Sequence, residues 1–232
     1  MIEYLYKMNT NPITETKRPK PRKRIKRNKR RCIEKHMFDL ILNEIDKNVC
    51  NFDSNVVFNK KLLNVILYYT GLRINEVLLL CKKDFMKLIE SGKLDVYCKK
   101  TGDFRTVFLQ GSTKDKFMSH FPNIDLREKM HDLGIVNKWN KKLHNRDAER
   151  WMYPYFDMLE EKYGGQVALL KGRAWGFHSY RVNFINQIVR SADLDMASKI
   201  IGHKNPATTL IYFRKLDVKE NVIAGIIDKA IF

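Results

Sequence analysis

Cysteine is scarce in this sequence, and its four copies do not form pairs that bind metal. Cys32, Cys50, Cys81 and Cys98 are isolated from one another, and no CxxC pair is present. Cys32 and His36 have a spacing seen in metal sites, but no second pair accompanies them. The pattern therefore argues against a zinc site. It favours free thiols in a reducing, intracellular compartment.

Long apolar segments are missing as well. No apolar run reaches the roughly 18 residues that a membrane-spanning helix requires. The N-terminus lacks the apolar core of a secretory signal peptide. We therefore expect no membrane partner. No repeat period is present, so nothing indicates a repeat protein.

Acidic residues are outnumbered by basic ones. The 232-residue chain has 44 Lys and Arg against 26 Asp and Glu, which gives a formal net charge of +18 and a pI near 9.7. This charge favours a polyanionic partner such as DNA. The alternative is a generic basic composition from an AT-rich viral, plasmid or organelle genome, since Lys, Asn and Ile are all abundant. A hydrophobic content of 44% is typical of a globular chain.

The positive charge is concentrated before residue 32. Residues 17–31 read KRPKPRKRIKRNKRR, with eleven Lys or Arg in fifteen positions. Charge repulsion and two prolines disfavour a helix, so we expect residues 1–32 to form a disordered arm that binds phosphates without sequence preference. A nuclear-import signal or a solubilising tail is the alternative. The residues expected to contact DNA are Lys17, Arg18, Arg22, Lys23, Arg24, Lys26, Arg27, Lys29, Arg30 and Arg31.

Residues 33–232 are expected to form one domain, mainly α-helical with a small β-hairpin (α+β). Apolar residues at spacings of three and four predict most of the helices. Gly71 should end the second helix, and Pro154 should break the helical pattern that precedes residue 155. The predicted helices cover residues 33–45, 58–69, 74–81, 113–119, 124–132, 136–144, 155–163, 180–190, 193–201, 206–213 and 217–230.

Alternating apolar residues predict the hairpin. Leu94, Val96 and Cys98 alternate with Asp95 and Tyr97. The turn sequence KKTGD follows, and RTVFL then forms the returning strand.

Five polar side chains form the most informative pattern in the chain, because all of them could bind one phosphodiester. Arginine presents a planar fork of donors that matches phosphate oxygens. A tyrosine hydroxyl can form a covalent intermediate. The pattern indicates DNA strand breakage and rejoining without a metal, although each motif alone has a structural explanation. The five residues are Arg73 in TGLRINEV, His178 and Arg181 in HSYR, His203 in IIGHK and Tyr212 in TTLIYF.

Together these motifs resemble the tyrosine recombinase (phage integrase) family. TGLRINEVLLL is similar to the family's first box, and HSYRVNFINQIV with IIGHKNPATTLIYF is similar to its second. The resemblance covers roughly residues 35–232 and implies the fold of the family's catalytic domain. It implies Tyr212 as the nucleophile, Arg73 and Arg181 as the clamp on the scissile phosphate, and assistance from His178 and His203.

The family also places a lysine on a β-hairpin turn. Lys100 is the better match, and Lys99 is the alternative because neighbouring residues of a strand point to opposite sides. By resemblance, this lysine would protonate the departing 5′ oxygen as a general acid.

The resemblance implies a site-specific recombinase or integrase that forms a 3′-phosphotyrosine intermediate and needs no cofactor or metal. Its partners would be double-stranded DNA and further copies of the chain, as a homotetramer on DNA. Two alternatives stay open: a type IB topoisomerase-like relaxing enzyme, and a catalytically inactive DNA-binding relic. A relic is disfavoured because every catalytic position is retained.

Two features depart from the family pattern, and a third, the apolar C-terminal tail, has two possible packing partners. Members usually carry a core-binding domain before the catalytic one, and only about 32 residues precede the first predicted helix here. Val182 stands where the family often has His. The apolar tail ENVIAGIIDKAIF would dock on a neighbouring subunit by analogy, or pack on its own domain.

Overall fold

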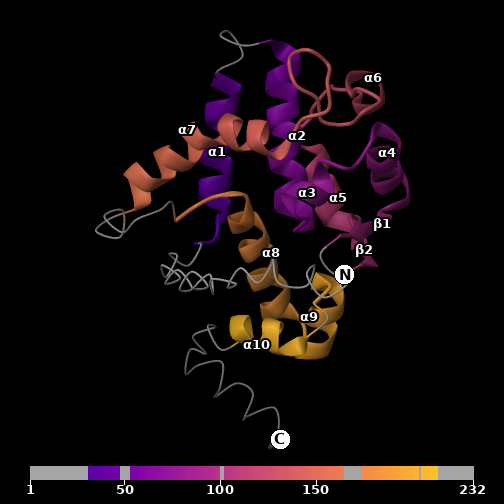
Figure 1. Ribbon diagram of the computed structural model, residues 1–232, viewed down its shortest axis with the longest axis vertical. Coiled ribbons are helices and arrows are strands. Elements are labelled where there is room, and N and C mark those ends of the chain that lie inside the picture. The colour runs from indigo at the N-terminus through magenta and orange to yellow at the C-terminus, as the bar shows by residue number, and fades with distance from the viewer. Residues whose placement is uncertain (1–30, 48–52, 100–101, 165–173, 204, 214–232) are drawn as a thin grey trace, which may run out of the picture.

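Helices dominate the part of the chain that the computed structural model describes, which comprises residues 31–47, 53–99, 102–164, 174–203 and 205–213 (Figure 1). This confirms the predicted mainly helical fold with a small hairpin. The helices are α1 (Lys35–Lys47), α2 (Ser54–Thr70), α3 (Ile74–Val77), α4 (Lys82–Ser91), α5 (Gly111–Met118), α6 (Leu126–Lys129), α7 (Asn145–Tyr163), α8 (Phe177–Ser191), α9 (Leu194–Ile201) and α10 (Pro206–Phe213). The strands β1 (Lys93–Cys98) and β2 (Asp103–Phe108) pair antiparallel.

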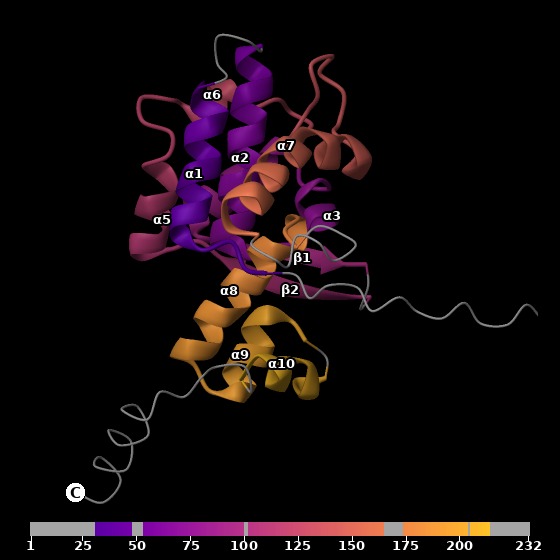
Figure 2. The ribbon, with the colours of Figure 1, turned by 90° about the vertical axis from the view of Figure 1, so that its left-hand side faces the viewer.

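Two hydrophobic clusters organise the molecule. The larger cluster draws on α1 to α7 and on the beginning of α8. The smaller cluster consists of Ile185, Val189, Ala197 and Ile201, with Tyr212 packed against it. Helix α8 therefore runs from the larger body to the small group that contains α9 and α10 (Figure 2). The boundary between the two clusters falls near Arg181.

The end of α2 is built for a sharp turn. Asp53 caps the start of this helix by accepting a hydrogen bond from the Asn55 N–H at 2.7 Å. Gly71 ends it in the left-handed region at φ 60°, as predicted from the sequence. A Cβ at Gly71 would lie 2.3 Å from Cδ1 of Phe184 on α8. Glycine thus allows both the turn and the close approach of α8, which places Arg73 beside that helix.

The predicted helix over 136–144 is wrong. This stretch is an irregular segment with an isolated bridge between Val136 and Lys142 and a positive φ at Asn140. The Asn137 side chain accepts hydrogen bonds from the backbone N–H groups of Trp139 and Lys141. A local side chain that satisfies backbone donors competes with the helix and favours a turn.

Pro154 does not break the helical pattern as predicted. It lies inside α7, which begins at Asn145 and continues to Tyr163. Pro154 is exposed, whereas Met152, Phe156 and other residues on the opposite side are buried in the core. Burial of that apolar face sustains the helix even though proline removes one backbone donor.

The helix predicted over 74–81 is shorter in the structure. Helix α3 ends at Val77, and Leu79 in the following turn is 62% exposed. Helix α4 then starts at Lys82 and was not predicted. The acidic residue in its first turn is typical of a helix start, because the Asp84 carboxylate accepts a hydrogen bond from the Cys81 N–H at 2.9 Å. The helix predicted over 124–132 is also shorter, since α6 has a single turn.

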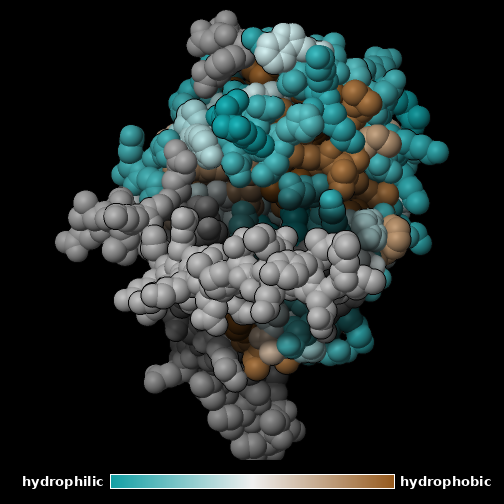
Figure 3. Space-filling view, viewed as in Figure 1, coloured by the Kyte–Doolittle hydropathy of each residue, from teal (hydrophilic) through white to brown (hydrophobic). Residues whose placement is uncertain are grey.

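The remaining predicted elements are confirmed within about four residues at their ends, except for 217–230, which lies outside the described residues. In the hairpin, Leu94, Val96 and Cys98 face inward as their alternation predicts. Among the described helices, none has both the length and the apolar character to cross a membrane. One face of the molecule is mostly hydrophilic, with apolar residues gathered on the larger body (Figure 3).

Candidate active site

Arg73 is held at the start of α3 by its own helix. Its backbone N–H donates to Oε2 of Glu76 at 2.8 Å, and its guanidinium donates to Oε1 of Glu76 at 2.7 Å. The same guanidinium nitrogen lies 3.1 Å from Sγ of Cys98 on β1. About a quarter of the Arg73 side chain is exposed. Glu76 therefore orients Arg73, whose guanidinium has five N–H donors.

Arg181 joins the two bodies of the molecule. It lies on α8 and is 2% exposed. Its guanidinium donates to the carbonyl oxygens of Gly71 and Ile201, each at 2.8 Å. Burial, with the charges of Arg105 and Arg73, lowers the pKa of Arg181 to about 9, so the group stays charged at neutral pH. One buried cation thus ties the end of α2 to the end of α9.

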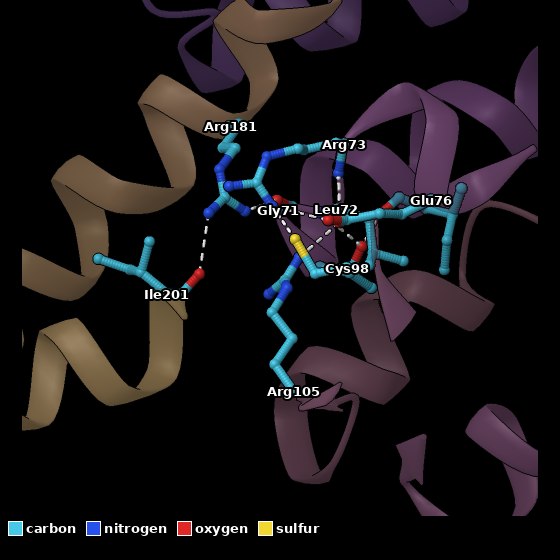
Figure 4. A network of polar contacts seen from close by, with 10 residues as sticks. Gly71, Leu72, Arg73, Glu76, Cys98, Arg105, Arg181 and Ile201 are labelled. Atoms are coloured by element: carbon cyan, nitrogen blue, oxygen red, sulfur yellow. Dashed lines mark hydrogen bonds and ion pairs between the residues drawn. The ribbon is translucent and has the colours of Figure 1, made fainter. Parts of the chain in front are cut away.

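Arg105 is a third arginine in this cluster, which the sequence analysis did not identify. It lies on β2, and its guanidinium donates to Oε2 of Glu76 at 2.9 Å. The Glu76 carboxylate therefore joins Arg73 and Arg105. Figure 4 shows the guanidinium groups of Arg73, Arg105 and Arg181 converging from α3, β2 and α8. Strand alternation in the sequence could have identified it, because Arg105 lies on the same strand face as the buried Val107 and a buried arginine needs a partner.

The charge of Glu76 follows from these partners. Burial would raise the pKa of Glu76, but the charge of Arg105 and the hydrogen bonds from Arg73 and Arg105 lower it to about 2. The cluster therefore holds three cations around one carboxylate, and a net positive charge remains for an anionic ligand. This arrangement suits a phosphate.

His203 and Tyr212 lie on the small body beside this cluster. The ring centroids of His203 and Tyr212 are 6.4 Å apart. Nδ1 of His203 lies 2.8 Å from the Thr209 hydroxyl, which also accepts a hydrogen bond from the Ser198 hydroxyl at 2.9 Å. These contacts fix the orientation of the imidazole beside Tyr212.

Tyr212 is half-buried on α10. Burial raises the pKa of its hydroxyl, and the positive charge of Arg181 lowers it. The net effect raises the pKa of Tyr212, so the hydroxyl is protonated at neutral pH, and the positive charge of Arg181 opposes part of that rise. The nine-residue spacing from His203 to Tyr212 thus brings both side chains to the same edge of the cluster.

A hollow of about 320 Å³ lies between the hairpin and the small body. It is lined by residues that include Cys98, Phe104, Arg105, Gly202 and His203. The structure thus provides open space beside both the arginine cluster and the predicted histidine.

His178 lies at the first turn of α8 and is exposed. It borders a different hollow, of about 340 Å³, which Ile74 and Tyr153 also line. Ile74 is the neighbour of Arg73, so this second hollow borders the segment that carries Arg73. The two predicted histidines therefore do not share a hollow.

Of the two candidate lysines on the hairpin turn, the structure describes Lys99. Lys100, the preferred match, lies outside the described residues. Lys99 follows Cys98 at the end of β1 and is exposed. Since Cys98 contacts Arg73, the hairpin turn begins close to the arginine cluster.

Nine of the ten residues predicted to contact DNA, from Lys17 to Arg30, lie outside the described residues. Arg31, the tenth, packs on the domain. Its guanidinium donates to the Tyr163 carbonyl at 2.9 Å and lies 5.2 Å from the centroid of the Trp175 ring. These contacts anchor the chain where the basic segment meets the first helix.

The low pKa of Glu76 predicts a pH-dependent contribution to stability. A carboxyl group whose pKa falls from its usual 4.5 to about 2 on folding stabilises the fold above pH 4.5, and this stability is lost as the pH drops toward 2. Glu76→Gln should therefore lower the free energy of unfolding at pH 7 by roughly 3 kcal/mol. The deficit should narrow as the pH falls from 4.5 to 2.

Urea unfolding at a series of pH values measures this difference. Glu90→Gln is the control, because Glu90 forms an ion pair with Arg127 on the exposed surface, where such pairs contribute little. A deficit for Glu76→Gln that stays constant down to pH 2 would contradict the assignment.

Comparison with known proteins identifies the family of this chain. Residues 32–219 match the phage integrase family. A probable integrase/recombinase protein of Methanocaldococcus jannaschii is 25% identical over 186 residues, which is 78% of this chain and 53% of that protein. The fold is that of tyrosine recombinase catalytic domains, and the chain belongs to the phage integrase family. It spans about half the length of this relative.

Solved structures show the same fold. The XerH site-specific recombinase, bound to its palindromic difH substrate, has a TM-score of 0.57 at 22% identity, covering 85% of this chain and 53% of that one. The XerA recombinase has a TM-score of 0.57 at 18% identity, covering 88% and 66%. The Tn1549 transposon integrase, in complex with a circular intermediate DNA, has a TM-score of 0.59 at 14% identity, covering 88% and 67%.

Proposed function

We propose that this chain is a site-specific DNA recombinase or integrase that cuts and rejoins DNA through Tyr212. The observation that supports this most is the convergence of Arg73 and Arg181, which lie 108 residues apart in the sequence, next to a half-buried tyrosine whose hydroxyl senses the charge of Arg181. Two guanidinium groups and a phenol at one edge provide an anion clamp and a nucleophile.

The reaction follows from these groups. The oxygen of Tyr212 attacks the scissile phosphorus, forms a 3′-phosphotyrosine bond and releases a 5′-hydroxyl. Arg73 and Arg181 stabilise the charge that develops on the non-bridging oxygens. His203 and His178 assist, and Lys100 or Lys99 gives the proton to the departing oxygen. Attack by a different 5′-hydroxyl then exchanges strands without an external energy source.

The partners of this reaction are also part of the proposal. Double-stranded DNA is the substrate, residues 1–32 lie along its phosphates, and the catalytic domain acts as one copy of a homotetramer. The net charge of +18 supports the DNA partner.

A covalent-trapping experiment tests the proposal. The purified chain is incubated, in the presence of a metal chelator, with nicked duplexes that carry a random core, so that the cleaved strand is released and the adduct cannot reverse. We expect a denaturant-stable adduct, with the nucleotide mapped to Tyr212 by peptide mass spectrometry. The absence of an adduct would favour a DNA-binding relic. Relaxation of supercoiled plasmid without a preferred site would favour a topoisomerase-like enzyme.

A further inference from the structure

We propose that Arg105 is a positioning residue that holds Arg73 and the His203 segment in register with each other. This inference rests on the proposed function, since it concerns the same phosphate site. Three observations carry it: the contact of Arg105 with Glu76, its burial, and its packing against Gly202.

The first observation is the shared carboxylate. Glu76 accepts from Arg73 with Oε1 and from Arg105 with Oε2, at 2.7 and 2.9 Å. Without Arg105, Oε2 of Glu76 would keep only the backbone N–H of Arg73 as a hydrogen-bond partner among the described residues. The carboxylate could then rotate, and the guanidinium of Arg73 would rotate with it. Arg105 therefore restrains the orientation of the phosphate clamp.

The second observation is how deeply Arg105 is buried. Its side chain is 7% exposed, and that of Glu76 is 5% exposed. Nε of Arg105 has no hydrogen-bond partner in the described structure. Burial of a cation with an unsatisfied donor is unfavourable by itself. The ion pair with Glu76 offsets this cost, and the same pair fixes the position of the Arg105 guanidinium beside Arg73.

The third observation links Arg105 to the other body of the molecule. A Cβ at Gly202 would lie 2.7 Å from Cδ of Arg105, so the arginine stem passes directly over the end of α9. His203 is the next residue. Gly202 also has a φ of 72°, which disfavours any side chain there. The head of Arg105 thus restrains Arg73 while its stem restrains the loop that carries His203.

Arg105→Met tests the inference, since it keeps most of the stem and removes the charged head. Single-turnover cleavage is measured on the nicked random-core duplexes that the wild-type chain converts to adduct, and DNA affinity is measured separately. We expect cleavage to fall by about 10²-fold, the order expected when a reacting group is misplaced. DNA affinity should stay within about twofold of wild type, because Arg105 is buried. Arg127→Met, which breaks the surface pair with Glu90, is the matched control and should leave both quantities unchanged.

The pH profile separates positioning from a general loss of structure. The charged groups that face Glu76 are Arg73 on α3, Arg105 on β2 and Arg181 on α8. Removing Arg105 removes the charge that most lowers the pKa of Glu76. The loss of cleavage on the acid side should therefore move to higher pH in Arg105→Met. Arg105→Lys keeps the charge, so the pH at which cleavage is lost on the acid side should return toward the wild-type value.

A double-mutant cycle completes the test. Arg105→Met should have little further effect on cleavage in a Glu76→Gln background, since both act through one carboxylate. If Arg105→Met melts below the assay temperature, Arg105→Lys carries the comparison, with cleavage reduced and DNA affinity retained. Wild-type cleavage by both Arg105 variants overturns the inference alone. Failure of the wild-type chain to form any adduct overturns the proposed function and this inference together.

Discussion

Tyr212→Phe is expected to abolish the covalent protein–DNA adduct, with cleavage falling by roughly 10⁴-fold or more, as for the loss of a catalytic nucleophile. The substitution removes one oxygen and keeps the ring, which packs against the small hydrophobic cluster. Folding and DNA affinity should therefore be close to those of the wild-type chain. Denaturing gel electrophoresis of the trapped reaction measures the adduct, and filter binding measures the affinity.

A matched tyrosine serves as the control for this prediction. Tyr163 is also half-buried, and it lies at the end of α7 with its ring against His36. Tyr163→Phe should give the wild-type yield of adduct. An adduct that persists in Tyr212→Phe would mean that another residue is the nucleophile.

Arg181→Ala should impair both chemistry and stability. Loss of a donor to the developing charge typically lowers the rate by roughly 10²–10³-fold. The substitution also leaves the carbonyl oxygens of Gly71 and Ile201 without the donors that Arg181 provides. Each buried acceptor left unsatisfied destabilises the fold by roughly 1–3 kcal/mol. Urea unfolding and single-turnover cleavage measure the two effects separately.

Arg181→Lys distinguishes the two roles. Lysine keeps the charge but cannot donate to both carbonyls in the fork geometry of a guanidinium. We expect a slow enzyme with a smaller loss of stability than that of Arg181→Ala. Arg190→Ala, at the exposed end of the same helix, is the control and should leave cleavage and stability within experimental error. Wild-type cleavage by Arg181→Lys would show that charge alone is sufficient at this position.

Much of the fold could be predicted where short-range rules decide the conformation. Gly71 ends α2 because a left-handed turn there favours glycine, and the alternation of Leu94, Val96 and Cys98 specifies which face of the hairpin is buried. The start of α10 matches the prediction because Pro206 stands at the first helical position, where proline is favoured. In each case the signal lies within a few residues of the feature.

Predictions failed where a side chain or a distant surface overrides the local pattern. The Asn137 side chain takes the backbone donors that a helix over 136–144 would use. Pro154 is tolerated in α7 because the opposite face of that helix is buried in the core. Neither effect is visible in the spacing of apolar residues, since both depend on which groups satisfy one another after folding.

For the site, sequence spacing was sufficient to name the phosphate-binding and nucleophilic candidates and to place Tyr212 near His203, since both lie on one short stretch of chain. Three-dimensional packing was needed to bring Arg73, Arg105 and Arg181 around Glu76, and to reveal that Arg181 ties two bodies of the molecule together. The physical reason is the separation along the chain over which each interaction acts. Helix caps and strand alternation act over a few residues, whereas a buried ion cluster exists only when segments far apart in the chain exclude water together.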